Sequence, residues 1–260
     1  RAAAVAKKSG FSGVQIHGAH GYLVSQFLSG HHNQRTDRWG GNAENRRRFV
    51  LEVFREMRAQ TGKDFPVGIK LNSADFQKGG FTEEESLDVI RALSEAGADL
   101  IEISGGTYES PIMTGKKNAF VKDSTRRREA YFLEFAEKAR AAVKTPLVVT
   151  GGFRSSAGMA EAITSGAVDF IGVARSLAIE PDLPNRLLAG KEPRYQVKMI
   201  STGVPMVDKM AMMEVMWYSR QLHRMAKGVE PKPHESGLWS LLATLAENGW
   251  GALQTRRMRA

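Results

Sequence analysis

The chain has 260 residues, of which 42% are hydrophobic and 25% are charged, with a formal net charge of +9 and no cysteine. The lack of cysteine excludes disulfides, thiolate zinc sites, cysteine nucleophiles and cysteine-held iron–sulfur clusters, and it is typical of a cytoplasmic protein. No apolar run reaches the roughly 18 residues of a membrane span. Lys and Arg are spread along segments that also carry acids, so we expect no nucleic-acid binding.

Short runs rich in Val and Ile alternate with longer segments of helical periodicity. The predicted strands cover residues 13–17, 67–71, 100–104, 147–150 and 170–173. They lack a clean alternation of polar and apolar residues, which indicates parallel strands buried on both faces.

Helices are predicted between these strands, at residues 2–8, 42–61, 82–95, 125–143 and 156–164. Thr82 and Glu85 have the spacing of a capping box, and Gly166 is expected to end the last of these helices. The turns at 95–99 and 165–169 share one small-residue pattern that leads into a strand, as expected of stacked β/α units.

Strict alternation of strand and helix predicts a parallel α/β fold, either an open doubly wound sheet or a (β/α)8 barrel. A barrel needs eight strands, and five are visible, so about three units would be missing before residue 1. The chain begins inside a helical segment, which indicates that it has been cut. We assign residues 1–192 to the partial barrel and 193–260 to a helical extension that packs on the barrel or on a neighbouring subunit; a membrane-surface helix is the alternative.

In parallel α/β folds, ligands meet the carboxyl ends of the strands. After the first predicted strand come His17, His20 and Tyr22. Two imidazoles can donate hydrogen bonds to an oxygen that gains negative charge, and a phenol can donate a proton. The alternatives are two structural histidines in a Gly-rich turn, or a metal site, for which no Asp or Glu lies nearby in sequence.

Lys70 lies within an apolar strand, where a cation is costly unless an anion or dipole meets it. One interpretation is a cation that faces a cofactor. The other is an ion pair with an acid of a neighbouring strand, such as Glu102.

Gly151 and Gly152 follow the fourth predicted strand, and Ala174 and Arg175 follow the fifth. The last two loops of a barrel commonly bind phosphate through backbone N–H groups, and an arginine can close over the anion. Ordinary turn glycines and a surface arginine are the alternative.

Two motifs then indicate a family. His17-Gly-Ala-His-Gly-Tyr22-Leu-Val-Ser-Gln-Phe-Leu is followed by Asn33-Gln-Arg35-Thr-Asp37-Arg-Trp-Gly-Gly, in which we expect Arg35 and Asp37 to brace a loop. Over residues 2–193 the sequence resembles the Old Yellow Enzyme family of FMN-dependent ene-reductases. The resemblance implies a (β/α)8 barrel with FMN at its mouth, NAD(P)H as reductant and a small unsaturated carbonyl compound as substrate. The sequence leaves the oligomeric state open, with a homo-oligomer as one alternative.

The resemblance also implies residue roles. His17 and His20 bind the substrate's carbonyl oxygen, Tyr22 stands where the family has its proton donor, and Lys70 replaces an arginine beside the flavin, which keeps the charge but loses the planar fork.

In the same way, Gly151 and Gly152 match the first phosphate loop. Ala174 and Arg175 match the second, with alanine in place of the usual glycine.

Two rival interpretations remain at this point. A flavin-free barrel enzyme acting on a phosphorylated substrate would account for the phosphate loops but not for the His-His-Tyr cluster. An inactive fragment would follow if the missing strands left open sheet edges.

Overall fold

The structure of the protein is a computed structural model that describes residues 1–105, 132–210 and 213–257. It divides into two compact units. The first comprises residues 1–153 and 157–172, and the second comprises residues 154–156 and 173–260. The second unit thus takes in residues 173–192, which the sequence assigns to the barrel, and the boundary at residue 193 stays a prediction.

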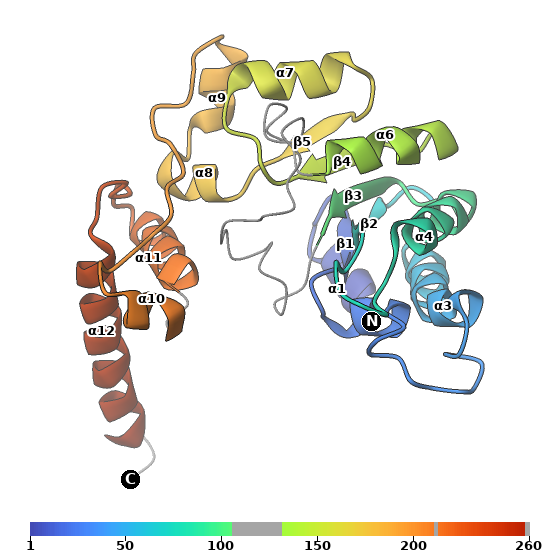
Figure 1. Cartoon of the computed structure of the whole chain (residues 1–260), viewed down its shortest axis with the longest axis horizontal. Helices are drawn as coiled ribbons and strands as arrows, with labels where there is room; N and C mark the ends of the chain where they lie inside the picture. Colours follow the sequence, from blue (N-terminus) through green and yellow to red (C-terminus); the bar gives the residue numbers. More distant parts are fainter. Residues whose placement is uncertain (106–131, 211–212, 258–260) are drawn as a thin grey trace. The chain divides into compact units, whose positions relative to one another are not determined.

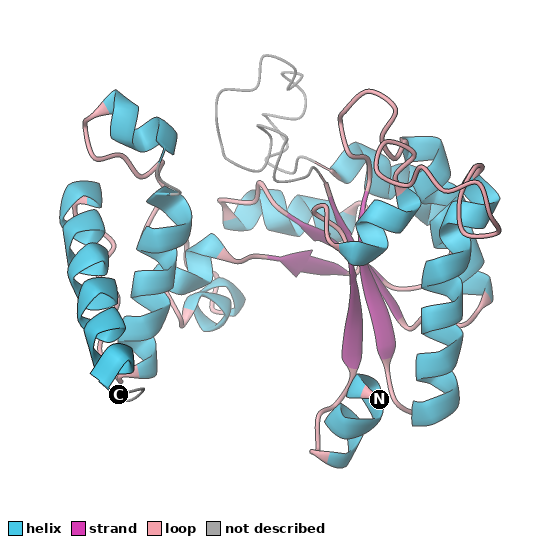
Figure 2. Cartoon of the chain, turned by 90° about the horizontal axis from the view of Figure 1, so that it is seen from below, coloured by secondary structure: helices cyan, strands magenta, loops and turns pink. Residues whose placement is uncertain are grey.

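The first unit is built on one parallel sheet in the order β1-β2-β3-β4-β5. Figure 2 shows the strands of this sheet in magenta. The strands are β1 (Val14–Gly18), β2 (Val67–Asn72), β3 (Leu100–Ser104), β4 (Leu147–Thr150) and β5 (Phe170–Gly172). All five predicted strands are therefore confirmed, each to within one residue at either end, and sequential neighbours pair as stacked β/α units require.

The helices associated with this sheet are α1 (Ala2–Lys8), α2 (Leu23–Leu28), α3 (Ala43–Thr61), α4 (Glu83–Glu95), α6 (Leu133–Ala142) and α7 (Ser156–Thr164). The short helix α2 was not expected. The predicted helix at 125–143 is confirmed from residue 133 onward, and its residues 125–131 lie outside the described part of the chain.

Local signals at the helix ends are confirmed. The Thr82 side chain accepts a hydrogen bond from the Glu85 backbone N–H at 3.3 Å, and the Glu85 side chain accepts one from the Thr82 N–H at 3.2 Å. This capping box satisfies two donors that a helix otherwise leaves free. Gly166 follows α7 with φ +74°, a conformation that glycine adopts without steric cost.

The sheet has one apolar face, and it forms the core. Ile16, Ile69, Ile101 and Leu147 are buried on it, and α3, α4 and α6 lie along the sheet (Figure 1). On β1 the neighbours of Ile16 are exposed. The expectation that every strand is buried on both faces is therefore wrong for β1, whose second face carries the exposed polar side chains of Gln15 and His17.

The two similar αβ turns make the same contacts. Asp99 precedes β3 and accepts a hydrogen bond from the backbone N–H of Val67 at 2.7 Å, while Arg58 pairs with it. Asp169 precedes β5 and accepts one from the N–H of Leu147 at 2.8 Å, while Arg140 pairs with it. The repeated sequence pattern thus marks a repeated β/α unit.

The second unit contains α8 (Arg175–Ile179), α9 (Leu183–Leu188), α10 (Pro205–Met210), α11 (Met213–Ala226) and α12 (Gly237–Arg257). The last three confirm helices within the predicted extension at 193–260, while its packing on the barrel or on a neighbouring subunit stays a prediction. Ala178, Ile179, Trp217 and Tyr218 form its core. Among the described residues, no helix is both long enough and apolar enough to cross a membrane.

Candidate active site

Three aromatic side chains gather at the carboxyl end of β1. The ring centroid of His17 lies 5.4 Å from that of His20 and 4.9 Å from that of Tyr22. His17 is on the strand itself, and the other two residues are in the loop that follows. The structure thus brings together the three residues that the sequence predicts to act together.

The backbone of His20 is held in an unusual conformation, with φ +63°. Few residues other than glycine adopt this region without compensation. Here the His20 backbone N–H donates to Asn72 Oδ1 at 3.2 Å, and the ring Nε2 lies 2.8 Å from Ser104 Oγ. Contacts from the ends of β2 and β3 therefore fix both the backbone and the ring of His20.

Both imidazoles are neutral at neutral pH. Burial, followed by the positive charge of Lys70, lowers the pKa of His17, and the same two causes lower the pKa of His20 to about 4. A neutral imidazole carries one N–H donor and one acceptor nitrogen. Each ring can therefore donate one hydrogen bond to an acceptor oxygen.

A row of polar side chains crosses the sheet beside these rings. His17 is the register partner of Lys70, and Lys70 is the register partner of Glu102. Lys70 Nζ lies 2.8 Å from Glu102 Oε1. The ion-pair interpretation of Lys70 is therefore confirmed, while its contact with a flavin stays a prediction.

Glu102 is the hub of this row. Its oxygens accept hydrogen bonds from Thr150 Oγ1 at 2.6 Å and from Gln15 Nε2 at 3.0 Å. Burial acts to raise the pKa of Glu102, but the hydrogen bonds from Lys70, Thr150 and Gln15 outweigh it and hold the pKa below its ordinary value. The carboxylate is therefore ionised, and Lys70 keeps a charged partner.

The glycines after β4 suit a phosphate. Gly151 has φ +114° and Gly152 has φ +96°, conformations that a Cβ would strain. Successive N–H groups in such a turn can line a concave anion site. With the neutral imidazoles and Lys70, these features fit FMN in their chemistry.

Ala174 and Arg175 lie at the start of α8 in the second unit, where Arg175 Nη1 pairs with Glu214 Oε2 at 3.1 Å. Because the two phosphate loops fall in different units, their joint action stays a prediction.

Two further residues support the site and were not predicted from the sequence. Asn72 donates from Nδ2 to Asp75 Oδ1 at 3.0 Å, which orients the amide that receives the His20 N–H. Ser104 binds the His20 ring. Both are polar residues at the carboxyl end of a strand, so the reasoning that singled out His17 would have found them.

Two other predictions concern the surroundings. Arg35 Nε donates to Asp37 Oδ1 at 3.0 Å, and Asp37 also accepts from the Trp39 N–H at 3.1 Å, so the loop-bracing role is confirmed. In the described ranges, no group of three His, Cys, Asp or Glu side chains is arranged to hold a metal ion.

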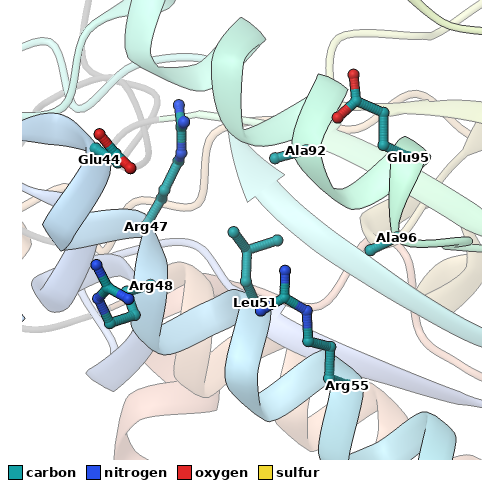
Figure 3. Close-up of a pocket in the computed structure, with 8 residues that line it drawn as sticks. All are labelled: Glu44, Arg47, Arg48, Leu51, Arg55, Ala92, Glu95 and Ala96. Atoms are coloured by element: carbon teal, nitrogen blue, oxygen red, sulfur yellow. The ribbon is translucent and has the colours of Figure 1, made fainter.

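A groove of about 460 Å³ lies elsewhere, between α3 and α4 (Figure 3). Its lining side chains are Glu44, Arg47, Arg48, Leu51, Arg55, Ala92, Glu95 and Ala96. None of the predicted site residues contributes to it. It belongs to the helices that cover the sheet and not to the strand ends.

Comparison with known proteins identifies relatives of this chain. The model of the "NADH:flavin oxidoreductase / NADH oxidase family" matches residues 1–193. The NADH-dependent flavin oxidoreductase iliE of Neonectria sp. (strain DH2) is 38% identical over 230 residues, which cover 85% of this chain and 29% of that protein. Three such relatives are covered over 29%, 48% and 58% of their lengths, so this chain spans only part of the relatives that it matches.

Solved structures agree. A 2-naphthoyl-CoA reductase complex is 32% identical with a TM-score of 0.66, covering 73% of this chain and 28% of that one. An Old Yellow Enzyme homologue from Zymomonas mobilis is 26% identical with a TM-score of 0.59, covering 76% of this chain and 51% of that one. The parallel β/α units are therefore part of a (β/α)8 barrel. These similarities support FMN as the cofactor and a nicotinamide as the reductant. The chain belongs to the NADH:flavin oxidoreductase / NADH oxidase family, the Old Yellow Enzyme family.

Proposed function

We propose that this flavin oxidoreductase uses NAD(P)H to reduce the activated C=C bond of α,β-unsaturated carbonyl compounds. The observation that carries the proposal is the cluster at the end of β1, where the ring centroid of His17 lies 5.4 Å from that of His20 and 4.9 Å from that of Tyr22. Ligands of parallel β/α folds meet the protein at this edge.

In this proposal, His17 and His20 each donate one hydrogen bond to the carbonyl oxygen of the substrate. Donors preorganised toward an oxygen that gains negative charge stabilise the transition state more than the ground state. Because their pKa values are lowered, the imidazoles act as neutral donors throughout the neutral pH range. Polarising the carbonyl makes the β-carbon electrophilic.

Tyr22 donates the proton that the α-carbon receives. Its ring lies 4.9 Å from that of His17, so one small substrate can touch both side chains. A phenol donates a proton in a positioned transition state more readily than bulk water does.

The cofactor would be held by residues from several strand ends. Lys70 would stand beside the flavin ring, and Gly151, Gly152, Ala174 and Arg175 would bind the phosphate. When bound, FMN supplies the hydride acceptor for NAD(P)H and the hydride donor for the C=C bond, in a ping-pong order. Lys70 is a compact cation without the planar fork of an arginine, so it would offer a point charge but no rigid bidentate contact.

The test separates the two half-reactions. The chain is loaded with FMN, and stopped-flow absorbance follows reduction by NADH and reoxidation by 2-cyclohexen-1-one. Tyr22→Phe is expected to slow reoxidation by about 100-fold, the usual contribution of a positioned acid, and to change reduction less than about twofold. The matched control is Tyr195→Phe, which removes a tyrosine hydroxyl from a residue of the second unit that has no proposed role in the reaction.

Equal slowing of both half-reactions by Tyr22→Phe would contradict the role of the phenol. A chain that binds no flavin and remains colourless would instead favour the flavin-free barrel enzyme. A flavin-loaded chain that oxidises NADH but leaves the enone unchanged would refute the substrate class alone.

A further inference from the structure

One contact of the site has a consequence for the chemistry of His20. Ser104 is the last residue of β3 and is 6% exposed. Its Oγ lies 2.8 Å from His20 Nε2, across 84 residues of sequence. The distance is that of a full hydrogen bond, and its direction depends on which ring nitrogen carries the proton.

His20 is neutral, so it has one proton to place. Burial and the charge of Lys70 lower its pKa to about 4. If the proton is on Nε2, the ring donates to Ser104. If it is on Nδ1, Ser104 donates to Nε2, and the Nδ1–H remains for another acceptor.

The hydroxyl of Ser104 distinguishes these two arrangements. In the part of the chain that the structure describes, His20 Nε2 is the one hydrogen-bond partner of Ser104 Oγ. If Ser104 accepted, its own buried O–H would have no acceptor there. An unsatisfied buried hydroxyl disfavours an arrangement by roughly 5- to 150-fold.

We infer that Ser104 is a positioning residue that donates its hydroxyl proton to His20 Nε2 and thereby holds His20 as the Nδ1–H tautomer. The backbone of His20 is fixed at the same time, because its N–H donates to Asn72 at 3.2 Å. Two strand ends thus fix the tautomer and the placement of one ring.

The inference deepens the proposed function and rests on it for its catalytic meaning. Among the described residues, His20 Nδ1 makes no hydrogen bond, so in the Nδ1–H tautomer it is the nitrogen free to donate to a carbonyl oxygen. In the opposite tautomer Nδ1 would present a lone pair and repel that oxygen. Ser104 therefore selects acceptor ligands without touching them.

The tautomer can be measured directly. The full chain is labelled with ¹⁵N-histidine, and long-range ¹H–¹⁵N spectra at neutral pH show which nitrogen of each ring is protonated. A His20→Gln variant identifies the signals of His20. The wild type is expected to show an excess of the Nδ1–H tautomer of roughly 5- to 150-fold.

Three variants test the cause. Ser104→Ala is expected to lower the Nδ1–H excess severalfold, and Ser104→Thr, which restores the hydroxyl, is expected to recover it. Ser94→Ala is the matched control, since it removes another partly buried serine hydroxyl, one that bonds Thr145 at 2.7 Å. In the flavin-loaded chain, Ser104→Ala should raise the KM for 2-cyclohexen-1-one about tenfold, whereas Ser94→Ala should leave this KM within about twofold of the wild type.

A wild-type His20 with its proton on Nε2 would overturn the inference, as would a folded Ser104→Ala variant that keeps the wild-type tautomer. Should Ser104→Ala fail to fold, the wild-type and Ser104→Thr spectra still decide the assignment. The spectra need neither flavin nor substrate. A chain that never reduces enones would therefore refute the proposed function and leave the tautomer assignment standing.

Discussion

The ion pair of Lys70 and Glu102 leads to a quantitative prediction about stability. The two side chains are 20% and 15% exposed, and their charged atoms lie 2.8 Å apart on neighbouring strands. Glu102→Gln keeps the shape and an acceptor for Thr150 but removes the negative charge. Lys70 is then left as a largely buried cation without a charged partner.

The expected cost follows from this burial. Removing one partner of a fully buried pair costs about 3–5 kcal/mol, whereas an exposed pair contributes about 0–1 kcal/mol. For a pair that retains slight exposure we expect Glu102→Gln to lower the free energy of unfolding by about 2–3 kcal/mol. Replacing both charges, as in Lys70→Met with Glu102→Gln, keeps an acceptor for Thr150 and should leave stability within about 1 kcal/mol of the wild type.

Urea unfolding followed by circular dichroism measures these free energies, with a double-mutant cycle for the pair. The control is Arg91→Gln, which breaks a pair with Asp88 in which both side chains are 49% exposed and should cost less than about 0.5 kcal/mol. If Glu102→Gln costs no more than the control, or if the double replacement costs more than Glu102→Gln alone, burial does not set the energy of this pair.

Three further predictions concern single residues. His20 should remain neutral in the folded chain as the pH falls from 6.5 to about 4. Because His20 of the unfolded chain takes up a proton in that window, the free energy of unfolding should decrease there. Histidine NMR titration and urea unfolding at several pH values check these two expectations. Thr82→Ala removes the N-cap acceptor of α4 and should cost about 1 kcal/mol in urea unfolding, with Thr82→Ser close to wild type; equal losses would contradict the capping account. Ile90→Ala, at a fully buried site, should cost about 2–5 kcal/mol, while Leu188→Ala, at a side chain that is 88% exposed, should cost less than about 0.5 kcal/mol; similar values would mean that the core is misassigned.

The regular elements could be predicted because their causes are local. A helix such as α4 depends on residues three or four positions apart, and its capping box is complete within four residues, from Thr82 to Glu85. The repeated turns before Asp99 and Asp169 were likewise visible in sequence, although their contacts with Val67 and Leu147 were not.

The candidate site was predicted in part. Its members His17, His20 and Tyr22 lie within six positions of one another, so a single loop brings them together. Lys70 was ambiguous, because its sequence neighbours do not say whether an acid or a ligand meets it. The register of β2 with β3 decided that point by placing Glu102 opposite it.

Residue types and short spacings were enough to predict the strands and helices and to select candidate site residues, because both patterns are local in the chain. The partners of those residues followed only from the packing of the sheet. The hydrogen bond from Ser104 to His20 joins two strand ends 84 positions apart, and parallel strands connected through helices bring such ends together only when the sheet has formed. For that reason the protonation and tautomer of His20 are properties of the fold and not of the motif.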